Sequence, residues 1–179
     1  VVVWPTGRQG VTPIARQLWM PPWAEWAVLH LYLLTGNDQL VNLVQWLAML
    51  GSVLLSARLG YLLSGNVKAR AASLSALFCA TIPMGALQAT STQTDYVTAF
   101  WVICLAYWSV LAHQRYPVGQ RLTTIQWAGL ACSTGLGMLT KGTYYAFAAP
   151  LLVWVLVSML RAPRSRDRPG QGASTHRDA

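Results

Sequence analysis

Residues 90–113 read TSTQTDYVTAFWVICLAYWSVLAH, a run of hydroxyl and amide side chains that ends in an acid and leads directly into an apolar stretch. The apolar part, residues 96–113, is close to the roughly 20 residues that a helix needs to cross a bilayer. Asp95 stands at the boundary and is the only acid between Asp38 and Asp167. Because an acid at a membrane boundary is unlikely to serve packing alone, Asp95 is the first candidate for chemistry.

The composition of the whole chain indicates a membrane protein. Of its 179 residues, 54% are hydrophobic and only 10% are charged, whereas a soluble domain carries about 25% charged residues. Lipid can solvate such a surface and water cannot. The hydropathy is spread over several runs, so we expect an all-α, polytopic membrane protein.

The apolar runs set the expected number of helices. A short run at 23–34 follows Pro21-Pro22 and ends before Gly36. At about 18 Å of helix it is too short to cross the hydrocarbon, so we expect an interfacial helix. Five longer runs are the expected transmembrane helices, and they cover residues 39–59, 69–89, 96–113, 122–139 and 143–160. Pro83 and Pro150 lie within runs, where neighbouring helices tolerate a kink.

The net charge of +8 is not gathered into one stripe, which argues against nucleic acid as a partner. If 23–34 does not span, one side of the membrane receives Arg58, Lys68, Arg70, Arg115, Arg121 and the Arg161–Arg168 cluster. The positive-inside rule makes that side cytoplasmic. Asp95 and Lys141 then face outward, and the expected location is the inner (plasma) membrane.

Three regions follow from this topology. Residues 1–35 form an external juxtamembrane loop with the interfacial helix. Residues 36–160 form the transmembrane module. Residues 161–179, rich in Arg, Pro, Gly and Ser, form a disordered basic cytoplasmic tail.

The outward side gathers the candidate site. Asp95 could act on a proton or orient a hydroxyl, or it could simply cap a helix that begins at Tyr96. Lys141 lies in a tight break between two spans and could bind a phosphate, or extend to lipid phosphate as a structural cation. Glu25 and Arg16 are further candidates for substrate binding, and a solvated side chain is the alternative for Glu25.

Other notable residues have structural interpretations. Gly129, Ser133 and Gly137 are spaced for close helix packing. His113 falls at a cytoplasmic helix end, where it is expected to interact with the helix dipole.

Three motifs in order resemble one family. They are Pro21-Pro22-x-x-Glu25, Ser91-Thr92-Gln93-x-Asp95 at the start of a span, and Gly135-Leu136-Gly137-Met138-Leu139-Thr140-Lys141-Gly142. Together they resemble integral-membrane glycosyltransferases of the GT-C fold (glycosyltransferase family 39), related to protein O-mannosyltransferases and aminoarabinose transferases.

The resemblance implies transfer of a sugar from a polyprenyl-phosphate donor to an acceptor at the external membrane face. It implies a catalytic role for Asp95, with Lys141 and Arg16 near the donor phosphate and Glu25 in a Pro-rich loop. A divalent cation is a possible cofactor, and membrane lipid is a partner.

The family's first span, with the acidic motif that supplies its base, would precede Val1, and further helices would follow the last span. We therefore expect the N-terminal to central part of a transferase, inactive alone.

Two other functions fit the residues without the resemblance. A transporter or flippase for an anionic lipid could use the same cations without bond chemistry. A non-catalytic membrane subunit is favoured if Asp95, Lys141 and Glu25 lie far apart.

Overall fold

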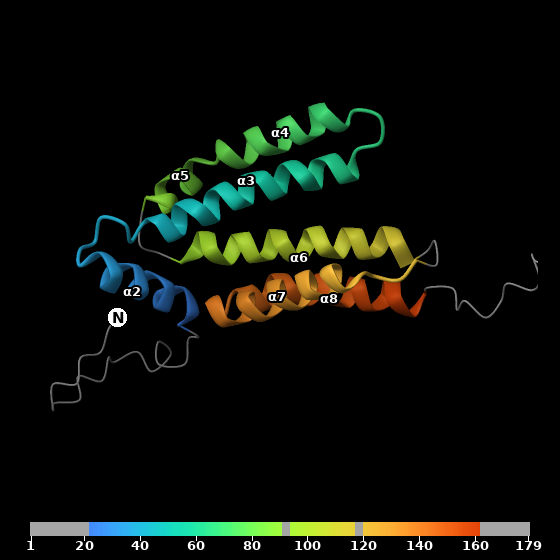
Figure 1. Cartoon of the computed structure of the whole chain (residues 1–179). Helices are drawn as coiled ribbons and strands as arrows, with labels where there is room; N and C mark the ends of the chain where they lie inside the picture. The colour runs from blue at the N-terminus through green and yellow to red at the C-terminus, as the bar shows by residue number, and fades with distance from the viewer. Residues whose placement is uncertain (1–21, 91–93, 117–119, 162–179) are drawn as a thin grey trace, which may run out of the picture.

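The computed structural model describes residues 22–90, 94–116 and 120–161. These segments contain helices and no strand, which confirms the all-α fold class. The helices are α2 (Trp23–Thr35), α3 (Leu43–Leu63), α4 (Lys68–Ala80), α5 (Pro83–Ala89), α6 (Asp95–Arg115), α7 (Thr124–Thr140) and α8 (Tyr144–Leu160) (Figure 1). The proposed tail falls almost entirely outside these segments, so the division into three regions stays a prediction.

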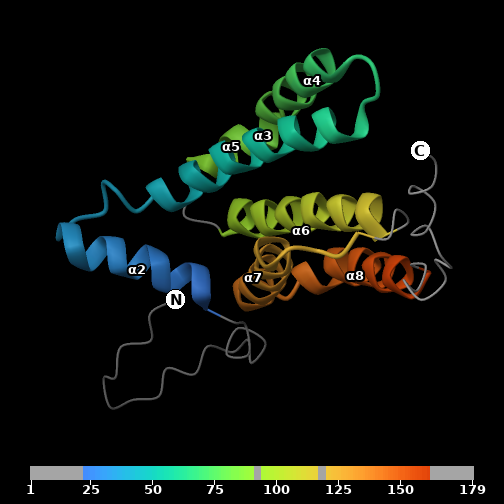
Figure 2. The same ribbon diagram turned by 45° about the vertical axis from the view of Figure 1, so that its right-hand side comes forward.

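Helix α6 is the centre of the bundle. The α3–α4 hairpin packs on one side of it, and α7 and α8 pack on the other (Figures 1 and 2). Helices α3, α6 and α8 run in the same direction, and α4 and α7 run back. The beginnings of α6 and α8 therefore lie at one end of the bundle, together with the end of α7.

Only some of the expected spans satisfy length and composition. Helices α3 and α6 each have 21 residues and are apolar enough to cross a membrane; at about 31 Å of helix, each is also long enough. Helix α8 is apolar but has 17 residues. Helix α7 also has 17 residues and is not among the candidate spans. The described part thus has two candidate spans, or three with the bent pair below, and the count of five stays a prediction.

The run expected as one span at 69–89 is broken. Helices α4 and α5 are bent by 63° at the break, where Ile82 is extended and Pro83 is the first residue of α5. Proline lacks an N–H and disfavours helical backbone in the residue before it. Pro83 therefore starts a new helix, whereas Pro150 lies within a continuous α8.

Helix α2 confirms the short element after Pro21-Pro22. It ends at Gly36, whose backbone is left-handed (φ 67°) and whose N–H donates to the Tyr32 carbonyl at 2.9 Å. The helix lies beyond the end of the bundle and not alongside it (Figure 1). It contacts α7, and Trp23 packs edge-on against Trp101 of α6. That α2 lies in the membrane interface stays a prediction.

Close packing joins α7 to its neighbours at the expected small residues. A Cβ added to Gly129 would collide with the Trp108 ring of α6, and one added to Gly137 would collide with the Tyr144 ring of α8. Ser133, between them, is buried. The prediction that this face serves packing is confirmed.

Charged residues separate between the two ends of the bundle. The end that holds the start of α6 carries every described acid, Glu25, Asp38 and Asp95, with one cation, Lys141; we call it the acidic end. The opposite, cationic end carries Arg58, Lys68, Arg70, Arg115, Arg121 and Arg161. The expectation that Asp95 and Lys141 share one side is confirmed.

Candidate functional site

Asp95 is the first residue of α6, and its carboxylate does not cap the helix. The residue that precedes the helix is Thr94, and no side chain accepts a capping hydrogen bond there. The alternative that Asp95 acts as an N-cap is therefore wrong. A carboxylate in the first turn is still stabilised by the positive end of the helix dipole.

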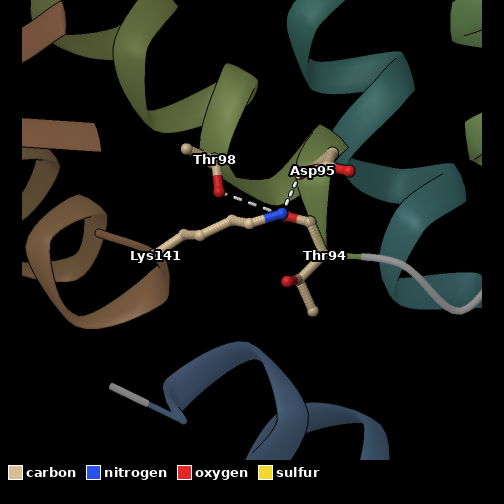
Figure 3. Close-up of polar contacts among 4 residues, drawn as sticks. All are labelled: Thr94, Asp95, Thr98 and Lys141. Carbon is tan, nitrogen blue, oxygen red and sulfur yellow. Dashed lines mark hydrogen bonds and ion pairs between the residues drawn. The ribbon is translucent and has the colours of Figure 1, made fainter. Parts of the chain in front are cut away.

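The Asp95 carboxylate instead forms an ion pair with Lys141 (Figure 3). The Lys141 ammonium donates to Asp95 Oδ1 across 46 positions of sequence. The two side chains are 29% and 33% exposed, respectively. The pair is thus partly shielded from water and still open to a ligand.

A tight turn holds Lys141 in place. Helix α7 ends at Thr140, and Lys141 takes an extended conformation. The Lys141 carbonyl accepts from the Tyr144 N–H at 3.0 Å, in the first residue of α8. The turn therefore fixes the backbone from which the lysine side chain extends toward α6.

Tyr144 fixes the turn against α7. The side chain is fully buried, and its hydroxyl donates to the Ser133 carbonyl at 2.8 Å. Its ring occupies the space that Gly137 leaves open. The glycine of the sequence motif therefore contributes to the site indirectly, because it positions the turn that carries Lys141.

The first turn of α6 supplies the polar groups beneath the ion pair. Thr94 and Thr98 are buried, and the Thr98 hydroxyl donates to the Thr94 carbonyl at 3.2 Å (Figure 3). This bond joins the first turn of α6 to the residue that precedes the helix, so the two threonines order the start of the helix beside Asp95.

An open groove of about 300 Å³ begins at the ion pair and runs between α6 and α8. Its lining is polar only near Asp95 and is otherwise mostly apolar; the lining residues are Asp95, Thr98, Ala99, Val102, Ile103, Thr143 and Phe147. The arrangement suits an amphiphile with a charged head at Lys141 and an apolar tail between the helices.

Sequence reasoning missed most of this groove. The α6 residues follow the spacing i, i+3, i+4, i+7 and i+8 from Asp95, so they share one helix face, and this signal could have been found. The contribution of Phe147 could not, because it depends on how α8 packs against α6.

Two candidate residues do not join the pair. Glu25 is exposed on α2 and has no ion pair or hydrogen bond to any other described residue. Arg16 lies outside the described residues. Of the candidate residues that the structure describes, only Asp95 and Lys141 contact each other. The catalytic or binding roles of all four residues stay predictions.

The described segments contain no group of three His, Cys, Asp or Glu side chains that could hold a metal ion. At the ion pair, Asp95 is the one carboxylate recorded in contact with Lys141. A divalent cation there would need further ligands from a bound donor or from other segments.

Comparison with known proteins identifies the family. The family model described as dolichyl-phosphate-mannose-protein mannosyltransferase matches residues 20–169. No curated protein and no solved structure matches the chain. The match covers most of the chain, includes both residues of the ion pair, and confirms the resemblance to GT-C membrane glycosyltransferases. With its apolar helices, the chain is a multi-pass membrane protein that belongs to the dolichyl-phosphate-mannose-protein mannosyltransferase family.

Proposed function

We propose that the chain forms part of a transferase that moves a sugar from a polyprenyl-phosphate donor to an acceptor at the external membrane face. The observation that carries this proposal is the position of the Asp95–Lys141 ion pair at the head of an apolar groove. A lipid-linked sugar phosphate has the same division into a charged head and an apolar tail.

The groove provides an apolar surface for the lipid chain of the donor. Its α6 residues run from Asp95 to Ile103, a length of about 12 Å along the helix. The exposed Phe147 ring forms part of the opposite wall. The proximal part of a polyprenyl chain lies here, and the rest continues into the bilayer.

Lys141 binds the donor phosphate by exchanging partners. In the unliganded protein its ammonium is paired with Asp95. An incoming phosphate offers charge-assisted hydrogen bonds of the same kind from more than one oxygen, and it displaces the carboxylate. Binding of the donor thus releases Asp95 for the acceptor.

The released carboxylate orients the acceptor. Asp95 accepts a hydrogen bond from the acceptor hydroxyl, whose proton passes to a base as its oxygen attacks the anomeric carbon. The bond from that carbon to the phosphate oxygen breaks, and the electron pair remains on the phosphate. Lys141 stabilises this negative charge.

The charges at the two ends of the bundle support an orientation of the protein in the membrane. Six of the described cations gather at the cationic end, and cytoplasmic flanks of inner-membrane proteins are enriched in Lys and Arg. The acidic end, with the ion pair, then faces the external or periplasmic side.

A release assay tests the proposal in the full-length protein. Polyprenyl-phosphate-mannose labelled in the sugar serves as the probe, in membranes that contain the native acceptors. Asp95→Asn and Lys141→Gln should each lower the rate of label release about 100-fold or more. The matched control is Asp38→Asn, an exposed acid at the same end, and it should remain within about twofold of wild type.

The outcome separates transfer from the two alternatives. Wild-type release by Asp95→Asn at normal protein levels removes Asp95 from the mechanism. A wild-type protein that moves the labelled lipid across the bilayer without releasing its sugar is a flippase. A protein that does neither is a non-catalytic subunit.

A further inference from the structure

A second cavity lies between α6 and α8 at the cationic end of the bundle. Its volume is about 180 Å³, and it is lined by His113, Trp154, Val157, Ser158 and Arg161. It is separate from the groove at Asp95, with which it shares no lining residue. Its lining comes from the last turn of α6 and the last two turns of α8.

The polar groups of this cavity are held in one arrangement. Ser158 is buried, and its hydroxyl donates to the Trp154 carbonyl at 2.8 Å. That bond uses the one hydroxyl hydrogen. His113 Nδ1 lies 2.9 Å from the same oxygen and forms a hydrogen bond with it. The imidazole also packs against the Trp154 ring, with centroids 4.8 Å apart and the ring planes tilted by 36°.

This hydrogen bonding departs from the expected role of His113 at a helix end. The imidazole is fixed by a serine and a tryptophan of another helix, and not merely placed near the α6 dipole. With Nδ1 committed to Ser158, the Nε2 edge is the one that remains for a ligand. The cavity wall is thus ordered before any ligand arrives.

Arg161 brings a positive charge to the cavity, and no carboxylate of the described segments balances it. The one ion pair within the described segments is that of Lys141 and Asp95, and the cationic end has no described acid. The Arg161 backbone N–H donates to the Val157 and Met159 carbonyls, and its side chain is exposed. No described residue supplies an anion to this guanidinium, so the cavity is open to an anionic ligand.

We propose that this cavity binds the phosphate of an anionic phospholipid headgroup. A guanidinium presents paired N–H donors that match phosphate oxygens. The site lies at the ends of two apolar helices, where headgroups are found, and Trp154 is a residue type enriched at that depth. Anionic lipids are also attracted to juxtamembrane cations. The inference does not depend on the proposed transfer reaction.

Lipid binding to the purified full-length protein tests this site. The protein is exchanged from detergent into phosphatidylglycerol or phosphatidylcholine with the same acyl chains, and bound lipid is counted by native mass spectrometry. Wild type should retain phosphatidylglycerol in preference to phosphatidylcholine. Arg161→Gln should weaken phosphatidylglycerol retention about fivefold or more.

The matched control is Arg121→Gln. Arg121 is exposed at the same end and does not line the cavity, so retention should change by less than about twofold. Ser158→Ala removes the hydroxyl that holds His113 and should also weaken retention. Because Arg161 and Arg121 are exposed, both variants should keep the wild-type melting temperature, which shows that the fold is retained.

Three results would overturn the proposal. Equal losses in Arg161→Gln and Arg121→Gln would mean that charge attracts lipid without a site. Unchanged retention in Arg161→Gln would exclude the cavity. If inorganic phosphate at millimolar concentration, and not phosphatidylglycerol, bound in an Arg161-dependent way, the lipid assignment would be wrong.

Discussion

The two ends of the α6–α8 pair treat their cations differently. At the acidic end, Lys141 is paired with Asp95 at the head of the larger groove. At the cationic end, Arg161 borders a smaller cavity, beside a histidine that is held by Ser158 and Trp154. Among the described residues, these two helices thus present a cation that is paired with a carboxylate at one end and a cation that has no paired carboxylate at the other.

The presence or absence of a paired carboxylate determines how each cation can bind a ligand. A paired lysine exchanges partners, so its ligand must displace a carboxylate and thereby changes the state of that carboxylate. Arg161, which has no ion-pair partner among the described residues, can bind a ligand without releasing another group. The first arrangement suits a reaction step, and the second suits orientation and anchoring in the bilayer.

Reversing the ion pair should have the largest effect. The double variant Asp95→Lys with Lys141→Asp restores opposite charges but moves the carboxylate to the turn before α8. Sugar release should remain about 100-fold or more below wild type. Stability should differ little, because a partly exposed pair contributes only about 1 kcal/mol or less. Recovery of both activity and stability would show that the pair is structural.

Gly137→Ala should disturb the turn that carries Lys141. The added Cβ collides with the buried Tyr144 ring, and overpacking of this kind costs about 1–3 kcal/mol. The matched control is Gly135→Ala in the same helix, where an added Cβ meets no atom within 4 Å. Thermal unfolding in detergent measures both. Equal melting temperatures for the two variants would contradict the packing assigned to Gly137.

Tyr144→Phe should have a smaller effect. It removes the hydroxyl that donates to the Ser133 carbonyl, and loss of such a bond costs about 1 kcal/mol. Tyr145→Phe, at a side chain that is 50% exposed on the same helix, should leave the midpoint of unfolding unchanged. A larger fall in the midpoint of unfolding for Tyr145→Phe than for Tyr144→Phe would contradict the stabilising role of the Tyr144 hydrogen bond.

Lys68→Gln at the cationic end should have the smallest effect. The Lys68 ammonium lies 5.3 Å from the centroid of the exposed Tyr61 ring, and an exposed contact of this type contributes about 0.5–1 kcal/mol. The free energy of unfolding should fall by no more than this amount, and the rate of sugar release should not change. A loss of release would show that the cationic end takes part in the reaction.

The sequence predicted the features that depend on local pattern. The break at Lys141 and the helix end at Gly36 follow from hydropathy and turn chemistry and lie where they were expected, and α6 begins one residue before the expected start at Tyr96. The family motifs were also sufficient for the correct family. The separation of acids and cations between the two ends was also predicted from the sequence, because successive spans place their connecting loops on alternate sides.

Features that depend on packing were not predictable in the same way. The sequence places Pro83 inside an apolar run, but it does not tell a mild kink from the 63° bend between α4 and α5. The local sequence suggests that Asp95 caps a helix. The ion pair that engages its carboxylate instead involves Lys141, 46 positions away, and a local pattern cannot reveal it. The bond from His113 to Ser158 likewise requires the register of α6 against α8.

Cysteine labelling in intact cells determines whether the ion pair and its groove open at the external face. Asp38→Cys at the acidic end and Arg70→Cys at the cationic end are made in a full-length protein whose native cysteines are replaced by alanine. A membrane-impermeant maleimide added to intact cells should label Asp38→Cys and should reach Arg70→Cys only after permeabilisation. Labelling of Arg70→Cys alone in intact cells would place the ion pair on the cytoplasmic side and contradict the account.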